Sequence, residues 1–126
     1  MSSDKLIYLV SVEPSERDSL TRYFRKHQFN AQIFENLSAA EAAVNEQAPE
    51  LIVLAGSRIP SPEICKFGAA VERSCSAPII ALLTKLQVSI VSEMAESENL
   101  WTAEYPITLR EIRASVNEAF EELAEG

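Results

Sequence analysis

The sequence predicts an α/β fold in which helices cover both faces of a parallel sheet. Short apolar segments alternate five times with segments of helical period along 126 residues, a length typical of one ordinary domain. The first and third apolar segments are almost continuously hydrophobic, as expected for strands buried on both faces. Because helical connections between buried strands imply a parallel arrangement, we expect five strand–helix units in one domain, residues 1–126.

The first unit combines a buried strand with an amphipathic helix. We predict the strand at residues 5–12, KLIYLVSV, which are mostly apolar and β-branched or aromatic. Pro14 and Ser15 then open a helix over about residues 15–27. The apolar side chains of this helix share one side: Leu20, Tyr23 and Phe24.

The second unit has a less buried strand. Residues 29–34, FNAQIF, alternate apolar and polar side chains, which suits a strand at a sheet edge. Ser38 and Glu41 have the spacing of a capping box, so we predict that they start the helix AAEAAVNEQ at residues 39–47. This helix stops before Pro49.

The third and fourth units follow the same plan. We predict strands at residues 50–56 and 78–83. Ser61 and Pro62 are suited to the N-cap and first position of the third helix. The fourth helix is expected at residues 86–96, with one apolar face: Ile90, Val91 and Met94.

The fifth unit has the weakest strand, at residues 100–105. Thr108 and Glu111 form a second capping-box pattern before a helix at about residues 109–123. Its apolar stripe consists of four residues: Ile112, Val116, Phe120 and Leu123.

The order of the strands in the sheet follows from their burial. Right-handed crossovers leave few topologies. The flavodoxin-like order 2-1-3-4-5 fits best, because the alternating strand at residues 29–34 suits an edge and the first and third strands suit the middle. In such a sheet ligands bind at the carboxyl ends of the strands. The residues just after each strand therefore determine the function.

Composition and charge narrow the possible partners. The net charge of −8 and the pI of about 4.7 disfavour direct binding of nucleic acid. The chain has no apolar run long enough to cross a membrane, and its start, MSSDKL, lacks the pattern of a secretory signal, so we expect a cytoplasmic protein. An acidic cluster in the last helix is interpreted as a solvated face: Glu118, Glu121, Glu122 and Glu125.

The sequence offers little support for a metal or cofactor site. Its glycines, at positions 56, 68 and 126, form neither a P-loop nor a dinucleotide-binding pattern. The loop VEPSER, residues 12–17, has no glycine and is a poor flavin site. Cys65 and Cys75 lack metal-type spacing and are interpreted as reduced structural thiols. His27 is interpreted as a cation at the end of the first helix. No cofactor and no metal are therefore predicted.

Several phrases of the sequence resemble the response-regulator receiver family. The resemblance covers residues 5–123. The phrases that match the ends of the family's first, third and fourth strands are VSVEP at 10–14, APELIVLAG at 48–56 and APIIALLT at 77–84. Tyr105 and Pro106 fall where the family has Lys-Pro after the fifth strand. The resemblance implies a cis bond before Pro106 and a two-component-type signalling role.

The residues that receiver chemistry requires are missing from the matching positions. The family uses an aspartate that accepts a phosphoryl group, an acidic pair for Mg²⁺, a hydroxyl and a lysine, because charge develops on the transferring oxygens. By resemblance, Ala55 stands at the position of the acceptor aspartate, and Ser11 and Val12 stand at the positions of the acidic pair. Leu83 stands at the position of the hydroxyl, and Tyr105 at that of the lysine. A shift of one residue would bring Thr84 to the hydroxyl position, but we prefer Thr84 as a helix cap. Glu13 is the acid that remains, and one carboxylate is a poor Mg²⁺ site.

The combined losses predict a phosphorylation-independent pseudo-receiver that binds a protein partner or dimerises. The expected surface is the face of the fourth helix, fifth strand and fifth helix. Its candidate residues are Leu86, Val88, Trp101 and Tyr105. Tyr105 is also expected to fill the emptied pocket. The ending EELAEG has no clear stop except Gly126, which suits the N-terminal module of a longer signalling protein.

Three alternatives stay open. One is a small flavodoxin-like domain that binds a cofactor or acts as an enzyme. Another is a receiver with a displaced phosphorylation site. A serine near the crevice, Ser11 or Ser57, could be phosphorylated instead, although loop hydroxyls more often bond to the backbone. Trp101 could equally pack against the last helix.

Overall fold

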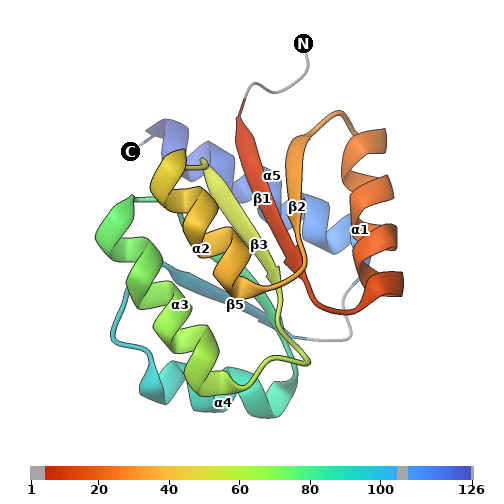
Figure 1. Ribbon diagram of the computed structural model, residues 1–126. Helices are drawn as coiled ribbons and strands as arrows, with labels where there is room; N and C mark the ends of the chain where they lie inside the picture. Colours follow the sequence, from red (N-terminus) through yellow and green to blue (C-terminus); the bar gives the residue numbers. More distant parts are fainter. Residues whose placement is uncertain (1–4, 105–107, 126) are drawn as a thin grey trace.

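A computed structural model of the chain describes residues 5–104 and 108–125, with side chains described up to residue 121. It shows one parallel five-stranded sheet in the order β2-β1-β3-β4-β5, with a helix after each strand (Figure 1). The strands are β1 Leu6–Ser11, β2 Asn30–Phe34, β3 Leu51–Ala55, β4 Ile79–Leu83 and β5 Leu100–Glu104. The helices are α1 Pro14–Lys26, α2 Leu37–Glu46, α3 Ser61–Ser74, α4 Lys85–Met94 and α5 Leu109–Glu125. The predicted fold and strand order are confirmed.

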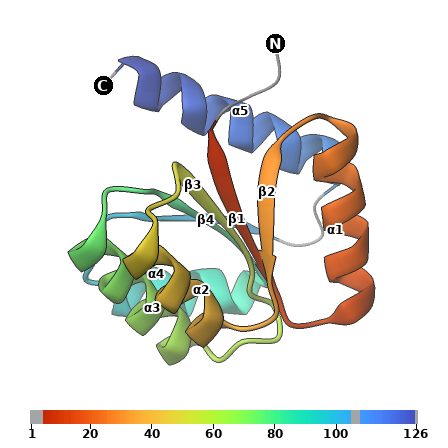
Figure 2. The ribbon, with the colours of Figure 1, turned by 45° about the horizontal axis from the view of Figure 1, so that its top comes forward.

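The helices form two layers on opposite faces of the sheet. Figure 2 shows α2, α3 and α4 on one face and α1 and α5 on the other. The first layer packs on the sheet to form the first core, in which it buries Ala40, Val44, Ile64, Phe67, Val71 and Val91. The second layer forms the second core on the opposite face, in which it buries Leu20, Phe24, Ile112, Val116, Ala119 and Phe120. None of the helices in the described ranges is long and apolar enough to cross a membrane.

Burial of the strands follows the sequence pattern. Every residue of β1, β3 and β4 is buried, whereas the edge strands β2 and β5 contain only half-buried and exposed residues. Successive side chains of a strand point to opposite faces, so each central strand supplies both cores. This is why the central strands had to be almost continuously apolar.

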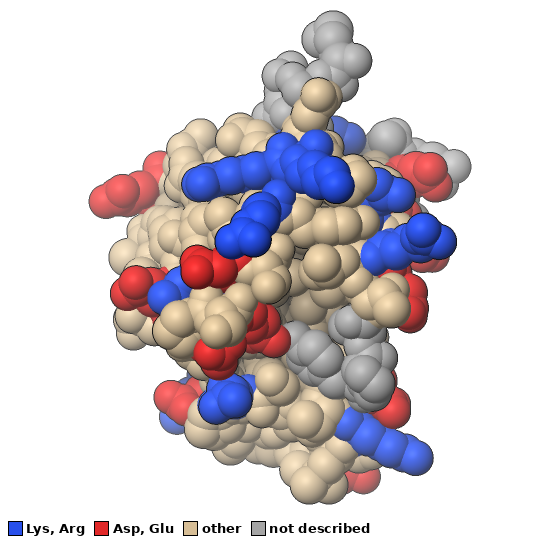
Figure 3. Space-filling view, turned by 90° about the vertical axis from the view of Figure 1, so that its right-hand side faces the viewer, with Lys and Arg blue, Asp and Glu red and all other residues tan. Residues whose placement is uncertain are grey.

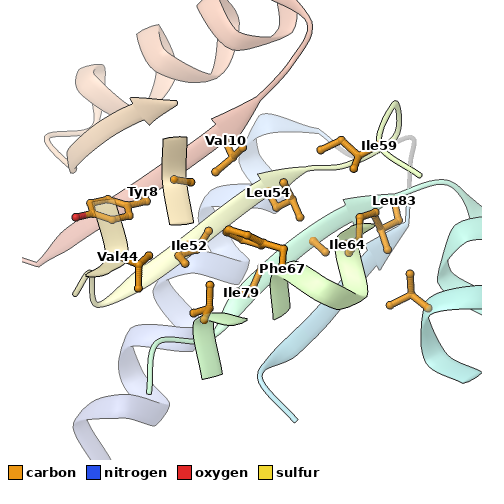
Figure 4. Packing of buried hydrophobic residues seen from close by; sticks show 14 of the residues in the cluster. Tyr8, Val10, Val44, Ile52, Leu54, Ile59, Ile64, Phe67, Ile79 and Leu83 are labelled. Carbon is orange, nitrogen blue, oxygen red and sulfur yellow. The ribbon is translucent and has the colours of Figure 1, made fainter. Parts of the chain in front are cut away.

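The Tyr8 ring packs in the first core, and its hydroxyl points away from the other labelled side chains (Figure 4). Tyr8 lies on β1, is 1% exposed, and donates hydrogen bonds to the carbonyls of Gln47 at 2.5 Å and Ala43 at 3.3 Å. These bonds tie β1 to the end of α2. Burial, helped by the nearby Glu46 and Cys75, raises the pKa of Tyr8, because the anion would be poorly solvated there.

The start of α2 differs from the prediction. Asn36 is the N-cap, and its side-chain oxygen accepts a hydrogen bond from the Ala39 N–H at 2.8 Å. Ser38 and Glu41 lie inside the helix and do not cap it. Asn is at least as good an N-cap as Ser. Starting two residues earlier also lets Leu37 pack against the first core.

The other helix starts match the prediction in part. The N-cap of α3 is Pro60 and not Ser61, which is the first helical residue and is 8% exposed. The backbone N–H groups of Glu63 and Ile64 both donate to the Pro60 carbonyl, and no side chain caps this helix. Thr84 caps α4 as expected. Thr108 caps α5, since its hydroxyl accepts from the Glu111 N–H at 3.1 Å and donates to the Glu111 carboxylate at 3.0 Å.

The predicted inner faces of the helices are confirmed except at α4. Val91 is buried, but Met94 is 46% exposed, because α4 ends there and the chain turns away with Ala95 as its C-cap. The side chain of Leu123, the last member of the α5 stripe, lies outside the described residues.

Candidate functional site

The carboxyl ends of the strands meet at one edge of the sheet, which is the candidate site. Ser11 pairs with Ala55 across β1 and β3, Ala55 pairs with Leu82, and Leu83 pairs with Glu104. Figure 1 shows the ends of β1 and β3 side by side at this edge. Ligands of open parallel sheets bind at such an edge, so its side chains decide what the domain can do chemically.

The end of β1 is closed by the first turns of α1. Ser11 is fully buried, and its hydroxyl donates a hydrogen bond to Glu16 Oε1 at 3.0 Å. The Arg17 guanidinium donates to the Ser11 carbonyl at 3.1 Å. The next residue, Val12, packs against the first core. Neither position that the resemblance assigns to the acidic pair carries a charge, and Ser11 is buried while Val12 is half-buried.

Glu13 is used as a helix cap. Its Oε2 accepts a hydrogen bond from the Glu16 N–H at 2.7 Å, which makes it the N-cap of α1. This bond is the main reason that the pKa of Glu13 is lowered, and the Ser15 N–H, Arg58 and Arg17 lower it further. Glu16 was missed from the sequence. Its position three residues after Glu13, where a capping-box acid lies, was the available signal.

The ends of β3 and β4 are filled by apolar side chains. Ala55 is 1% exposed and packs in the second core, and Leu83 is fully buried. A methyl group added at Gly56 would lie 2.8 Å from Leu83 Cδ2 and 3.2 Å from Ile64 Cδ1, so these side chains occupy the space beside Gly56 (Figure 4). Ser57 is half-buried in the loop that follows. Hydrocarbon thus stands where the resemblance places an acceptor and a hydroxyl.

Gln87 joins two loops at this edge and was not singled out from the sequence. It completes a capping box with Thr84: its Oε1 accepts from the Thr84 N–H at 2.9 Å, and its own N–H donates to Thr84 Oγ1 at 3.2 Å. Its Nε2 donates to the carbonyls of Gly56 at 2.8 Å and Ile59 at 2.9 Å. One side chain therefore fixes the start of α4 to the loop between β3 and α3.

The residues at this edge do not fit the Mg²⁺ site that the receiver resemblance implies. Magnesium needs several hard oxygen ligands, usually including carboxylates. Ser11 and Ala55 supply no carboxylate, and the carboxylate of Glu13 is engaged by a backbone N–H. Across the described parts of the chain, no three His, Cys, Asp or Glu residues are grouped as metal ligands. Cys65 and Cys75 are half-buried free thiols, and burial raises the pKa of Cys65.

The predicted partner face is only partly exposed. Leu86, on α4, is 70% exposed, and Met94 at the other end of α4 is 46% exposed. Val88 is half-buried and packs against the first core, so it contributes less surface than predicted. Tyr105, with its bond to Pro106, lies outside the described residues. The exposed apolar surface of α4 is therefore formed by Leu86 and Met94.

Trp101 lies on the edge strand β5 between two hollows. It is half-buried and packs against the second core, which includes α5. A hollow of about 350 Å³ lies on its α5 side, beside Ser115 and Glu118. A second hollow, of about 390 Å³, is lined by Trp101 together with Cys75 and Pro78. Trp101 thus packs on the last helix and also lines accessible surface.

His27 differs from its predicted role as a cation. It is the C-cap of α1, and the Arg113 guanidinium of α5 lies 2.7 Å from its Nδ1. The Tyr23 ring stacks at a tilt, with ring centroids 4.5 Å apart. Desolvation first, then the charges of Arg113 and Lys26, lower the pKa of His27. The neutral ring, an acceptor for Arg113, is therefore favoured.

Known structures share this architecture although their sequences differ. No protein-family model and no curated protein matches the sequence. The N-terminal domain of a response regulator/sensory box/GGDEF three-domain protein from Carboxydothermus hydrogenoformans is 14% identical, with a TM-score of 0.76 over 96% of this chain and 98% of that chain. A response regulator receiver domain protein from Methanospirillum hungatei JF-1 is 18% identical, with a TM-score of 0.77 over 98% and 100%. This chain has the receiver fold.

The fold is also found under other descriptions. A protein described as an adenylate cyclase from Rhodopirellula baltica is 17% identical to this chain, with a TM-score of 0.81 over 94% of this chain and 89% of that chain. At identities this low, the likeness establishes the fold and leaves the activity to be argued from the site.

Substitution of Gln87 separates its two roles. Gln87→Ala loses the side-chain bond to the Thr84 N–H and both loop bonds, while the bond from the backbone N–H of residue 87 to Thr84 Oγ1 can remain. We expect the free energy of unfolding in urea to fall by about 1–2 kcal/mol. Gln87→Glu keeps an oxygen for the Thr84 N–H but presents an oxygen to the loop carbonyls. Amide hydrogen exchange at Ile59 should accelerate in both variants, and exchange at Thr84 only in Gln87→Ala. Unchanged exchange at Ile59 in both would contradict the loop-fixing role.

The contact between His27 and Arg113 makes stability depend on pH. Because the folded-state pKa lies below the ordinary 6.5, the unfolded chain binds the proton more readily. The contribution of neutral His27 to the free energy of unfolding is present above the ordinary pKa of 6.5 and is lost as the pH falls from there through the lower folded-state pKa. Urea unfolding from about pH 8 to about pH 5 should show this loss in the wild type and less of it in His27→Gln. Identical pH dependence in the two proteins would show that His27 has no such role.

Proposed function

We propose that this domain is a pseudo-receiver of a two-component-type regulatory system, which acts by binding a protein partner or a second copy and is not phosphorylated. The closed carboxyl edge of the sheet carries this proposal. The edge that holds ligands in open parallel sheets is here filled by Ala55 and Leu83, and Glu13 caps α1.

Phosphoryl transfer to this edge lacks its chemical requirements. An acceptor needs a nucleophilic oxygen, and the methyl group of Ala55 has none. The charge that builds on the transferring oxygens must be balanced by a metal or a cation. The buried ends of β3 and β4 offer hydrocarbon at these places. This supports a domain without phosphoryl chemistry and without enzymatic activity.

The edge also supports a single conformation. A switch needs two arrangements whose balance a ligand or modification can shift. Gln87 already bonds α4 to the β3–α3 loop through two hydrogen bonds to loop carbonyls. A link between these segments therefore exists without a phosphoryl group, so partner binding would be constitutive.

The proposed binding surface is the face of α4, β5 and α5. Leu86 is the most exposed large apolar side chain of the described residues, and Met94 is the other one that is exposed. Trp101 adds an aromatic ring beside the hollow between β5 and α5. Exposed apolar side chains and partly buried tryptophans are both typical of protein interfaces. We infer that this face forms a homodimer or docks a protein partner.

A receiver with displaced acids is the second candidate, because the structure brings Glu16 close to Glu13. The two are linked by the Glu16 N–H, and Glu16 also contacts the buried Ser11 hydroxyl. Both carboxylates already accept hydrogen bonds from the protein, which reduces their capacity to bind a metal. The first candidate is therefore preferred.

The oligomeric state tests the first candidate. We expect the wild type to dimerise equally with and without acetyl phosphate and Mg²⁺, as measured by light scattering over a range of concentrations. Leu86→Glu places a charge in the proposed interface and should shift the protein to monomers, weakening association by about tenfold or more. Ala42→Glu, at an exposed position of α2, makes the same charge change elsewhere and should have no effect.

One outcome would overturn the proposal, and a second would narrow it. Association that appears only after treatment with acetyl phosphate would favour the receiver with displaced acids. A wild type that stays monomeric at high concentration would remove the homodimer and leave only a different protein as the partner.

A further inference from the structure

The second half of α1 carries positive charge on a chain that is acidic as a whole. The net charge is −8, yet four of the eleven Lys and Arg residues belong to this one helix. We define the basic strip as Arg22, Arg25 and Lys26 of α1 together with Arg113 of α5. Figure 3 shows Lys and Arg side chains gathered in a band across the α1 side of the molecule. This charge is therefore concentrated and not evenly spread.

The charges of the basic strip are not neutralised within the described residues. Arg22, Arg25 and Lys26 are all exposed, and none has a carboxylate within ion-pair distance among the residues that the structure describes. The ion pair that α1 does make joins Arg17 to Glu35 at 3.8 Å, outside the strip. These three cations are thus available to a partner.

The fourth cation, Arg113, is held in position by a neutral group. Its guanidinium lies 2.7 Å from His27 Nδ1 and 3.2 Å from His27 Nε2, and a neutral ring leaves the positive charge in place. His27 is the C-cap of α1, so this contact brings Arg113 up to the α1 end of the strip. The strip therefore spans two helices.

Helix dipoles explain only part of this arrangement. Cations are favoured in the last turn of a helix, which accounts for Arg25 and Lys26. Arg22 lies about one turn earlier. The exposed Arg110 lies in the first turn of α5, where the dipole disfavours a cation, and Arg113 lies just beyond that turn. Helix dipoles therefore do not account for the positions of these two arginines.

A shallow hollow on α1 gives the strip a shape. It has a volume of about 380 Å³ and is lined by Thr21, Arg22, Arg25 and the acidic Asp18. Asp18 is the one carboxylate in this lining, so the hollow keeps a net positive charge. Two guanidinium groups at its rim can each bind a carboxylate through paired hydrogen bonds.

We propose that the basic strip docks a short acidic segment of a different protein, rich in Asp and Glu. Such a segment presents carboxylates only where the cations lie. A nucleic acid would extend its charge beyond the strip over a domain of net charge −8, which would repel it. The strip is distinct from the α4–β5 face, so the two proposals can fail separately.

Titration with a labelled acidic peptide tests this inference. The probe is a fluorescent peptide of about ten glutamates, titrated with the full chain at low salt and followed by fluorescence anisotropy. We expect binding that weakens steeply with salt. The double variant Arg22→Glu/Arg25→Glu should weaken it by about tenfold or more.

A matched variant separates the strip from the overall charge. Lys66→Glu/Arg73→Glu changes the net charge by the same amount at two exposed positions of α3. It should change the affinity by no more than about threefold, because the exchanged charges lie away from the bound peptide. Circular dichroism checks that both variants fold; the exposed positions make this the expected result.

Every other outcome contradicts the inference. No binding of the peptide by the wild type, or equal weakening in both variants, would show that the strip is not a docking surface. Tighter binding of a DNA duplex than of the peptide at the same salt would assign the strip to nucleic acid. Dimers that Arg22→Glu/Arg25→Glu abolishes would assign it to a second copy.

Discussion

Burial of β1, β3 and β4 on both faces is the constraint on which the rest of this structure depends. A strand covered by helices on both sides must be apolar along its length, and in this chain the apolar character continues to the last residues, Ala55 and Leu83. The backbone and polar groups that remain at the edge are then satisfied from within: Glu16 accepts from Ser11, and Gln87 donates to the loop carbonyls. In the proposed function, the same apolar burial that closes the edge also leaves no acceptor for phosphoryl transfer at Ala55.

A closed edge shifts the functional question to the outer surfaces of the helices. The α4–β5 face offers exposed hydrocarbon around Leu86 and Met94, and the α1 side offers concentrated positive charge. The two surfaces attract partners by different interactions, one by apolar burial and the other by charge. With both proposals together, the domain would bind an acidic partner on the α1 side and associate through the α4–β5 face.

The fold could be predicted from the sequence because strand and helix periods alternate so regularly, and the strand ends lie within one residue of their predicted positions. Features that depend on contacts between distant segments could not be predicted from the sequence. The bond from Gln87 to the Gly56 carbonyl joins residues far apart in the sequence, and the Arg113 that contacts His27 comes from the last helix. The prediction for the start of α2 was wrong for a local reason. Asn36 and Ser38 can both cap a helix, and the packing of Leu37 favours a start at Asn36.

The central claim is that the domain takes up no phosphoryl group. The direct measurement is the intact mass of the chain after incubation with acetyl phosphate and Mg²⁺, followed by mapping of any adduct by peptide mass spectrometry. The account predicts an unchanged mass, because Ala55 has no nucleophilic oxygen and the carboxylate of Glu13 is engaged as a helix cap. A mass gain of one phosphoryl group that maps to Glu13 or Glu16 would contradict it.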